Sequence, residues 1–405
     1  MFLSVLSLAA FADEPKFEKP EVPPEKVAEE PEFKLSAEGP GDGLPPDAAR
    51  IVGAWQRDIV RIAIDEMVHL CNANNLLAAL GAGPHFARQN FPISPGVHPA
   101  GVIVELAPLD RDTLQHFIFL ERPEGVDVPD GASFASNRDY HRGASISGLM
   151  PNATDFATVG HLYRGIRAGF VDLCAQRGES AVIVGDPARQ VGPDTMSLPG
   201  VTAVVDLASA CAAIDAIVAQ GEGNDGRDEQ AHYRRFVRIS EQWDQLGDVV
   251  PYGPLARSPV MRRPPTPAGR VWVDAPDAAR VMDVANATYN LMLRCLVAGF
   301  GQAGPWRGPA LDASVGLMQA LSPLAELLGR LPASTTQPGL TSGPSFALLR
   351  GIEPFEPGAV GARVLAERAG ELADGCRRLA GIDARIAADT AARLDAIAGS
   401  LSAPA

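Results

Sequence analysis

Apolar residues recur every three or four positions over long stretches of the chain, the spacing that places side chains on one face of an α-helix. The longest stretch predicts a helix over 47–80, ended by Gly81 and Gly83. Its apolar stripe consists of Ile51, Trp55, Ile59, Ile62, Met67, Leu70, Leu76, Leu77 and Leu80.

The same spacing predicts further helices at 111–121, 156–176, 204–221, 228–246, 275–298, 310–331 and 361–401. The core stripe of the 156–176 helix is expected to be Phe156, Val159, Leu162, Ile166, Phe170 and Leu173. Alternation typical of strands is scarce, with a short apolar segment at 102–106 and loops between the helices. The chain is therefore expected to be all-α, a helical bundle with long inter-helix loops and an additional C-terminal helical region.

Proline-rich stretches divide this pattern into four parts. Residues 13–46 are rich in Pro, Glu and Lys without an apolar period, which indicates a solvated linker. Residues 1–46 are thus expected to hold a short apolar start and this linker, 47–250 the bundle, 251–270 a second linker and 271–405 the C-terminal helices. Residues 1–12 allow two interpretations: a short signal peptide without its basic region, or the end of a core helix.

Composition narrows the function classes. A formal net charge of -14 and a pI near 5.0 argue against binding of nucleic acid. No apolar run reaches the roughly 18 residues that a membrane span needs. Five scattered cysteines without a C-x-x-C pair indicate reduced thiols in a cytoplasmic protein. The sequence does not determine the oligomeric state, and it allows a homo-oligomer.

The candidate chemistry begins with Glu66 and His69, which lie three residues apart in the first long helix and so share one face. A carboxylate and an imidazole within an apolar stripe are costly to bury unless a partner such as a metal ion satisfies them. The spacing recurs at Glu229 and His232. Two such motifs are the ligand pattern of ferritin-like dinuclear bundles, and these donors suit iron, manganese or zinc. The alternative is that both motifs are surface pairs.

Two further residues allow two interpretations each. Glu222 lies between two glycines where the third long helix is interrupted, so it either caps that helix or directs a carboxylate into the core. His161 lies near a helix start, where a lone histidine is more typical of a cap or the surface than of a ligand. The other histidines (His85, His98, His116 and His141) are interpreted as structural. The chain has no phosphate-binding glycine loop after a strand and no G-x-S-x-G elbow.

Several segments resemble the ferritin-like family of iminophenylpyruvate dimer synthases, found in violacein- and rebeccamycin-type pathways. They are IAIDEMVHLCNANNLLAALGAGP (62–84), FPISPGVHPAG (91–101), HFIFLERPEG (116–125), TVGHLYRGIRAGF (158–170), IVAQGEG (217–223), DEQAHYRRF (228–236), NATYNLMLRCL (286–296), VGLMQAL (315–321) and SGPSFALLR (342–350). The resemblance implies metal-ligand roles for Glu66, His69, Glu222, Glu229 and His232.

This chain departs from the family pattern in two places. His161 stands where relatives often carry a glutamate, so it either substitutes as a ligand or has no such role. Residues 2–8 resemble the apolar second half of the family's first helix without its carboxylate half.

The resemblance implies a metal-dependent oxidoreductase of secondary metabolism. Iron is the expected metal, and an aromatic imino acid is the expected small-molecule substrate. The alternative is a non-catalytic ferritin-like protein that binds a metal or a partner with an incomplete site.

Overall fold

The computed structural model describes residues 44–96, 98–135, 152–196, 198–223, 227–247, 255–264, 269–349, 351–352 and 358–402. Its α-helices are α2 (Pro46–Ala79), α3 (Arg111–Glu121), α4 (Val159–Arg177), α5 (Leu207–Gly221), α6 (His232–Leu246), α7 (Pro276–Gly301), α8 (Arg307–Arg330), α9 (Ala359–Arg377) and α10 (Ala384–Ser402). Short 3-10 turns lie at Pro99–Gly101, Ala153–Asp155, Glu179–Ala181 and Pro187–Arg189. Strands β1 (Pro259–Val260) and β2 (Val271–Trp272) pair in parallel. The predicted all-α class is confirmed.

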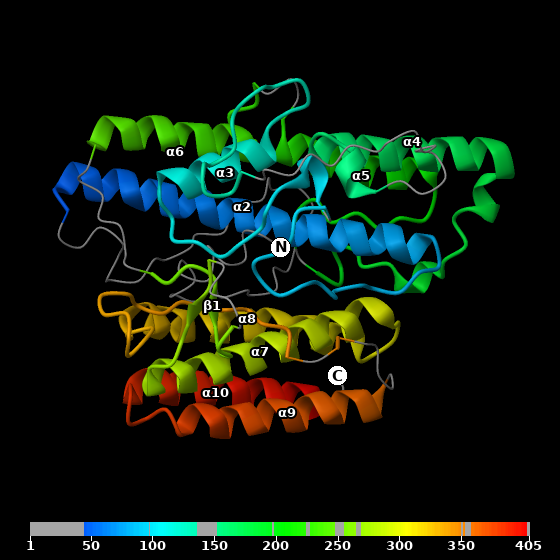
Figure 1. The fold of residues 1–405 in the computed structure, drawn as a ribbon. Helices are drawn as coiled ribbons and strands as arrows, with labels where there is room; N and C mark the ends of the chain where they lie inside the picture. The colour runs from blue at the N-terminus through cyan, green and yellow to red at the C-terminus, as the bar shows by residue number, and fades with distance from the viewer. Residues whose placement is uncertain are drawn as a thin grey trace.

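The helices form two layers (Figure 1). Helices α2 to α6 form one layer, in which α2 runs along the side that faces the second layer, built from α7 to α10. Strand β1 lies within the predicted second linker, 251–270, and β2 follows directly after its end. Residues 1–43 of the expected first segment, 1–46, lie outside the described residues, as does His141.

Helix α2 is the longest helix of the first layer. Pro46 occupies its first turn, where a missing N–H costs nothing, and Gly81 follows its end with a φ of 76° that favours glycine. The prediction for 47–80 is therefore confirmed to within a residue at each end. Trp55, Ile59 and Ile62 of the predicted stripe are buried, whereas Leu80 is exposed.

Asparagine side chains attach a long loop to α2. Asn75 donates to the carbonyls of Val191 and Thr202 and accepts the N–H of Val191. Asn72 donates to the carbonyl of Gly200 and accepts the N–H of Thr202. An amide side chain has a donor and an acceptor, so it can replace a strand partner for an irregular backbone. The loop between α4 and α5 is thereby fixed along the α2 surface.

Two apolar clusters meet along α2. One joins its first half to α3 and α6 and includes Ile59, Ile62, Leu114, Phe236 and Trp243. The other joins its last turns to α4 and α5 and includes Leu76, Ala79, Phe170, Ala210 and Ile214. Glu66 and His69 lie between Ile62 and Leu76, so they occupy the junction of the two clusters. A third, larger cluster packs the C-terminal layer against the 86–106 loop.

The predictions for the α4 stripe and for the helix at 361–401 are wrong in part. The expected stripe of α4 points partly outward, with Val159, Ile166 and Leu173 exposed, because α4 buries a face built around Phe170 and Cys174 instead. The single helix expected at 361–401 is two helices, α9 and α10. Asp383 ends the turn between them and accepts the N–H of Ile386, as an N-terminal cap does.

In the part of the chain that the structure describes, no helix combines the length and apolarity that crossing a bilayer requires. All five cysteines lie in that part and are free thiols.

Candidate metal centre

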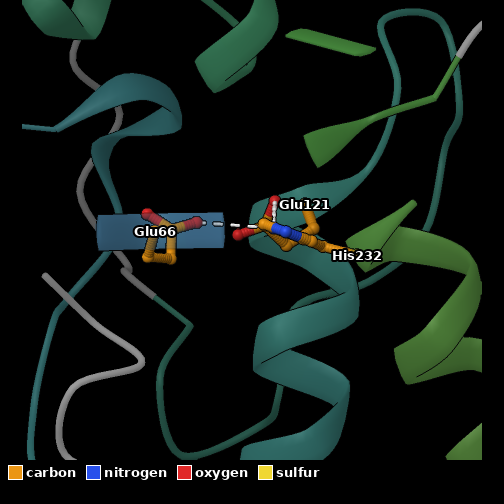
Figure 2. Close-up of side chains that lie close together, drawn as sticks. All are labelled: Glu66, Glu121 and His232. Carbon is orange, nitrogen blue, oxygen red and sulfur yellow. Dashed lines mark ion pairs between the residues drawn. The ribbon is translucent and has the colours of Figure 1, made fainter. Parts of the chain in front are cut away.

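Three side chains from three helices converge at the junction of the two clusters. Glu66 lies in the middle of α2, Glu121 is the last residue of α3, and His232 is the first residue of α6. Figure 2 shows the two carboxylates facing the imidazole. Nδ1 of His232 lies 3.4 Å from Oε1 of Glu66 and 3.7 Å from Oε2 of Glu121. One ligand atom of each residue lies within 4.8 Å of the others.

His69 lies one turn after Glu66 on the same face of α2. Its Nδ1 is 3.4 Å from the same Glu66 Oε1 that His232 approaches, and the two imidazole rings are 5.4 Å apart between centroids. The structure therefore brings together Glu66, His69 and His232 of the sequence-predicted site residues, and it adds Glu121.

Helix ends make this arrangement electrostatically unusual. Glu121 places a carboxylate at the C-terminal, partially negative end of α3, and His232 places an imidazole at the N-terminal, partially positive end of α6. The helix macrodipoles disfavour a negative charge on Glu121 at the end of α3 and a positive charge on His232 at the start of α6. A cation held between the two side chains would offset both effects, because it would attract Glu121 and leave His232 neutral.

The pKa values show how the site is balanced without an ion. Burial would by itself raise the pKa of Glu66, but contacts with His232 and His69 lower that pKa well below its usual value. Burial would lower the pKa of His232, but the nearby carboxylates of Asp65, Glu121 and Glu66 raise it well above its usual value. The carboxylates around His232 therefore favour a positive charge at this point.

The donor set fits a metal ion. Nδ1 of His232 is fully buried and makes no hydrogen bond, although two carboxylates lie near it. Ligand atoms bound to iron, manganese or zinc at about 2.0–2.2 Å lie roughly 3 to 4.4 Å from one another, a range close to these separations. Carboxylate and imidazole donors are shared by all three metals. An ion at this point would satisfy the buried nitrogen and supply the positive charge that the carboxylates favour.

Glu222 lies beside this site, yet its carboxylate has other partners. It is buried, with Oε1 accepting hydrogen bonds from the hydroxyl of Thr158 (3.0 Å) and the N–H of Gly160 (2.9 Å). Oε2 accepts from Arg164 (3.1 Å), which also binds Glu124. A β-carbon on Gly160 would lie 2.1 Å from Oε1, so the carboxylate occupies the space that this glycine leaves. In this structure Glu222 caps α4.

Glu229 does not share a helix face with His232. Asp228 accepts the N–H of Gln230 with its side chain and that of Ala231 with its carbonyl, which forms a turn, and α6 begins only at His232. The side chain of Glu229 is 58% exposed and binds Arg234 and, more loosely, Arg238. The expected helix start at 228 is therefore wrong by one turn.

His161 also lies apart from the cluster. Its Nδ1 accepts the N–H of Ala157 at 3.3 Å, and its ring meets Phe156 edge to face. These are contacts of a residue that supports the start of α4.

Glu121 is the functional candidate that sequence reasoning missed. It continues the buried stripe of α3 after Leu114 and Phe117, at steps of three and four residues, and it lies within a segment that carries the family resemblance. A carboxylate on an apolar stripe was the signal in the sequence that could have identified Glu121.

Tyr163 of α4 also lies near Glu66. Burial and the charge of Glu66 raise the pKa of Tyr163 to about 12, so its phenol stays protonated.

The fold and the site define a helical bundle with an interior cluster of carboxylates and imidazoles, the architecture of ferritin-like metal proteins. The chain belongs to the ferritin-like family, whose model matches residues 13–241. Ferritin-like bundles commonly hold metal ions between their helices.

Two curated relatives are similar over most of the chain. Dichlorochromopyrrolate synthase of Lentzea aerocolonigenes is 28% identical over 334 residues, which cover 73% of this chain and 30% of the relative. The 2-imino-3-(indol-3-yl)propanoate dimerase of Chromobacterium violaceum is 26% identical over 335 residues, which cover 78% of this chain and 30% of the relative. The chain thus spans less than a third of the length of these relatives. No solved structure matches it at a significant level.

Proposed function

We propose that the chain binds a metal ion between Glu66, Glu121 and His232, with His69 as an adjacent donor, and that iron is the metal. The observation that carries the proposal is the buried, unsatisfied Nδ1 of His232 facing two carboxylates from two other helices. An ion bound there would supply Lewis-acid or redox chemistry. The proposal leaves Glu222, Glu229 and His161 outside the donor set.

Metal analysis of the purified full chain tests this site. Wild-type protein is expected to carry iron in near-stoichiometric amount, and Glu121→Gln and His232→Gln are expected to lose it. Manganese or zinc in place of iron would contradict the choice of metal and keep the site. Glu229→Gln is the matched control, because it makes the same chemical change at an exposed glutamate that binds Arg234. Metal retained by the Glu121 and His232 variants, or lost in the Glu229 variant, would contradict the assignment.

We further propose that the protein is an oxidoreductase of secondary metabolism that acts on a small aromatic imino acid. The support is the similarity to two relatives whose names describe a dimerase of 2-imino-3-(indol-3-yl)propanoate and a synthase of dichlorochromopyrrolate. In this function Glu66, Glu121 and His232 would hold the ion, and the apolar clusters around them would limit the access of water.

A coupled assay tests the reaction. An amino acid oxidase generates the imino acid from tryptophan in the presence of the metal-loaded protein, and mass spectrometry detects a product that contains two substrate skeletons. Product formation by wild type and its loss in Glu121→Gln are expected. Stoichiometric metal without such a product would favour the alternative, a non-catalytic metal-binding or partner-binding protein.

A further inference from the structure

Both imidazoles of the candidate metal centre have a hydrogen-bond partner at the ring nitrogen that points away from Glu66. Nε2 of His232 lies 3.3 Å from Oδ2 of Asp65, and Nε2 of His69 lies 2.9 Å from Oε1 of Gln220. The opposite nitrogen of each ring, Nδ1, lies 3.4 Å from Oε1 of Glu66. Each ring thus directs its Nδ1 atom toward the carboxylate of Glu66.

The chemistry of the partners determines which nitrogen is available. A carboxylate oxygen and an amide oxygen are acceptors, so each Nε2 carries its hydrogen and donates it. In a neutral imidazole the other nitrogen, Nδ1, then has a free lone pair, which is the form that binds a metal ion. Asp65 and Gln220 therefore select the tautomer that directs Nδ1 of His232 and His69 toward Glu66.

The two partners also restrict ring rotation. Asp65 and Glu66 are consecutive residues of α2, and the ring of His232 lies between them with one nitrogen toward each carboxylate. His69 and Gln220 connect α2 with the last turn of α5. His232 is fully buried and His69 is 7% exposed, so water has little access to replace a lost partner.

We infer that Asp65 and Gln220 are positioning residues of the metal centre, which fix the tautomer and orientation of His232 and His69. This inference rests on the proposed metal site. Hydrogen-bond partners of metal-bound histidines contribute about 10- to 100-fold in metal affinity. The carboxylate of Asp65, which also makes its histidine a stronger base, is expected to contribute more than the neutral amide of Gln220.

The test is titration of the metal-stripped full chain with Co²⁺, measuring both the dissociation constant and the visible absorption bands that report ligand geometry. Asp65→Asn is expected to weaken Co²⁺ binding about 10- to 100-fold and to shift the bands. Asp58→Asn is the matched control: Asp58 lies two turns earlier on α2, is similarly half-buried and binds Arg238. It is expected to bind Co²⁺ as wild type does.

Gln220 provides a second, independent pair of variants. Gln220→Met removes the acceptor and is expected to weaken Co²⁺ binding about tenfold, whereas Gln220→Glu keeps an acceptor oxygen and is expected to restore it. Thermal unfolding of the metal-free variants separates a folding defect from a change at the site. If Asp65→Asn does not fold, the two Gln220 variants decide the question.

The outcomes distinguish this inference from the proposal beneath it. Wild-type protein that takes up no Co²⁺ would overturn the metal site and this inference together. Wild-type binding that Glu121→Gln abolishes, but that Asp65→Asn and Gln220→Met leave unchanged in affinity and spectrum, would overturn the positioning role alone.

Discussion

Replacing Glu222 with alanine separates a structural role from a ligand role. In the structure its carboxylate accepts hydrogen bonds from Thr158, Gly160 and Arg164 at the start of α4. The family resemblance instead implies that Glu222 binds the metal. The geometry predicts that Glu222→Ala destabilises the protein while leaving the metal bound.

The magnitude follows from these three contacts. A hydrogen bond to a buried charge is worth about 1.5 kcal/mol at the low end, which applies to the bonds from Thr158 and Gly160. The ion pair with Arg164 contributes only about 0.5 kcal/mol, because the arginine side chain is 39% exposed and solvent screens it. The free energy of unfolding is therefore expected to fall by about 3.5 kcal/mol.

The assay compares urea unfolding of metal-free protein with metal content after reconstitution. Glu222→Gln is the graded control, because its amide oxygen can still accept from Thr158 and Gly160, and it is expected to cost about 1 kcal/mol. A variant with wild-type stability that no longer binds metal would refute the capping role and would identify Glu222 as a ligand.

Three further predictions concern other parts of the molecule. Gly221→Ala would place a β-carbon 3.3 Å from Oε2 of Glu121, so the metal affinity measured by Co²⁺ titration should fall a few-fold. The stability of the helix should rise by up to about 1 kcal/mol. Unchanged metal affinity would argue against Glu121 as a ligand. Asn75→Asp removes the amide donor to two loop carbonyls and should lower the free energy of unfolding by about 2–4 kcal/mol in urea titrations; a loss below about 1 kcal/mol would contradict the loop-clamping role. In thiol labelling of native protein at pH 8, half-buried Cys211 should react first, because burial raises the pKa of Cys295 to about 12 and leaves only about one thiolate in 10⁴; rapid modification of Cys295 would refute this burial argument.

Much of the helical pattern was predictable because it is local. Periodic apolar residues placed α2 and α3 within a residue of their observed ends, since the spacing that buries one helix face depends on neighbours along the chain. The pattern failed where a turn divides one periodic run, as between α9 and α10, and where a helix has apolar residues on two faces. Val159 and Ile166 of α4 are apolar, but packing buried the other face.

The candidate site was predictable in part for the same reason. Glu66 and His69 stand three residues apart within a helix whose extent the sequence defines, so their shared face follows from helix geometry. Glu229 and His232 have the same spacing, yet the turn at Asp228 delays the start of α6 and separates them. Spacing predicts proximity only when both residues belong to one helix.

By itself, the sequence determined most of the helical segments and the shared face of Glu66 and His69 on α2. Only the tertiary structure decided that the end of α3 meets the start of α6 beside the middle of α2, which makes Glu121 a partner of His232 and assigns Glu222 to the start of α4. The physical reason is that local patterns specify the direction of a side chain from its own helix axis. The position of one helix end against another depends instead on how the apolar clusters of several helices pack together.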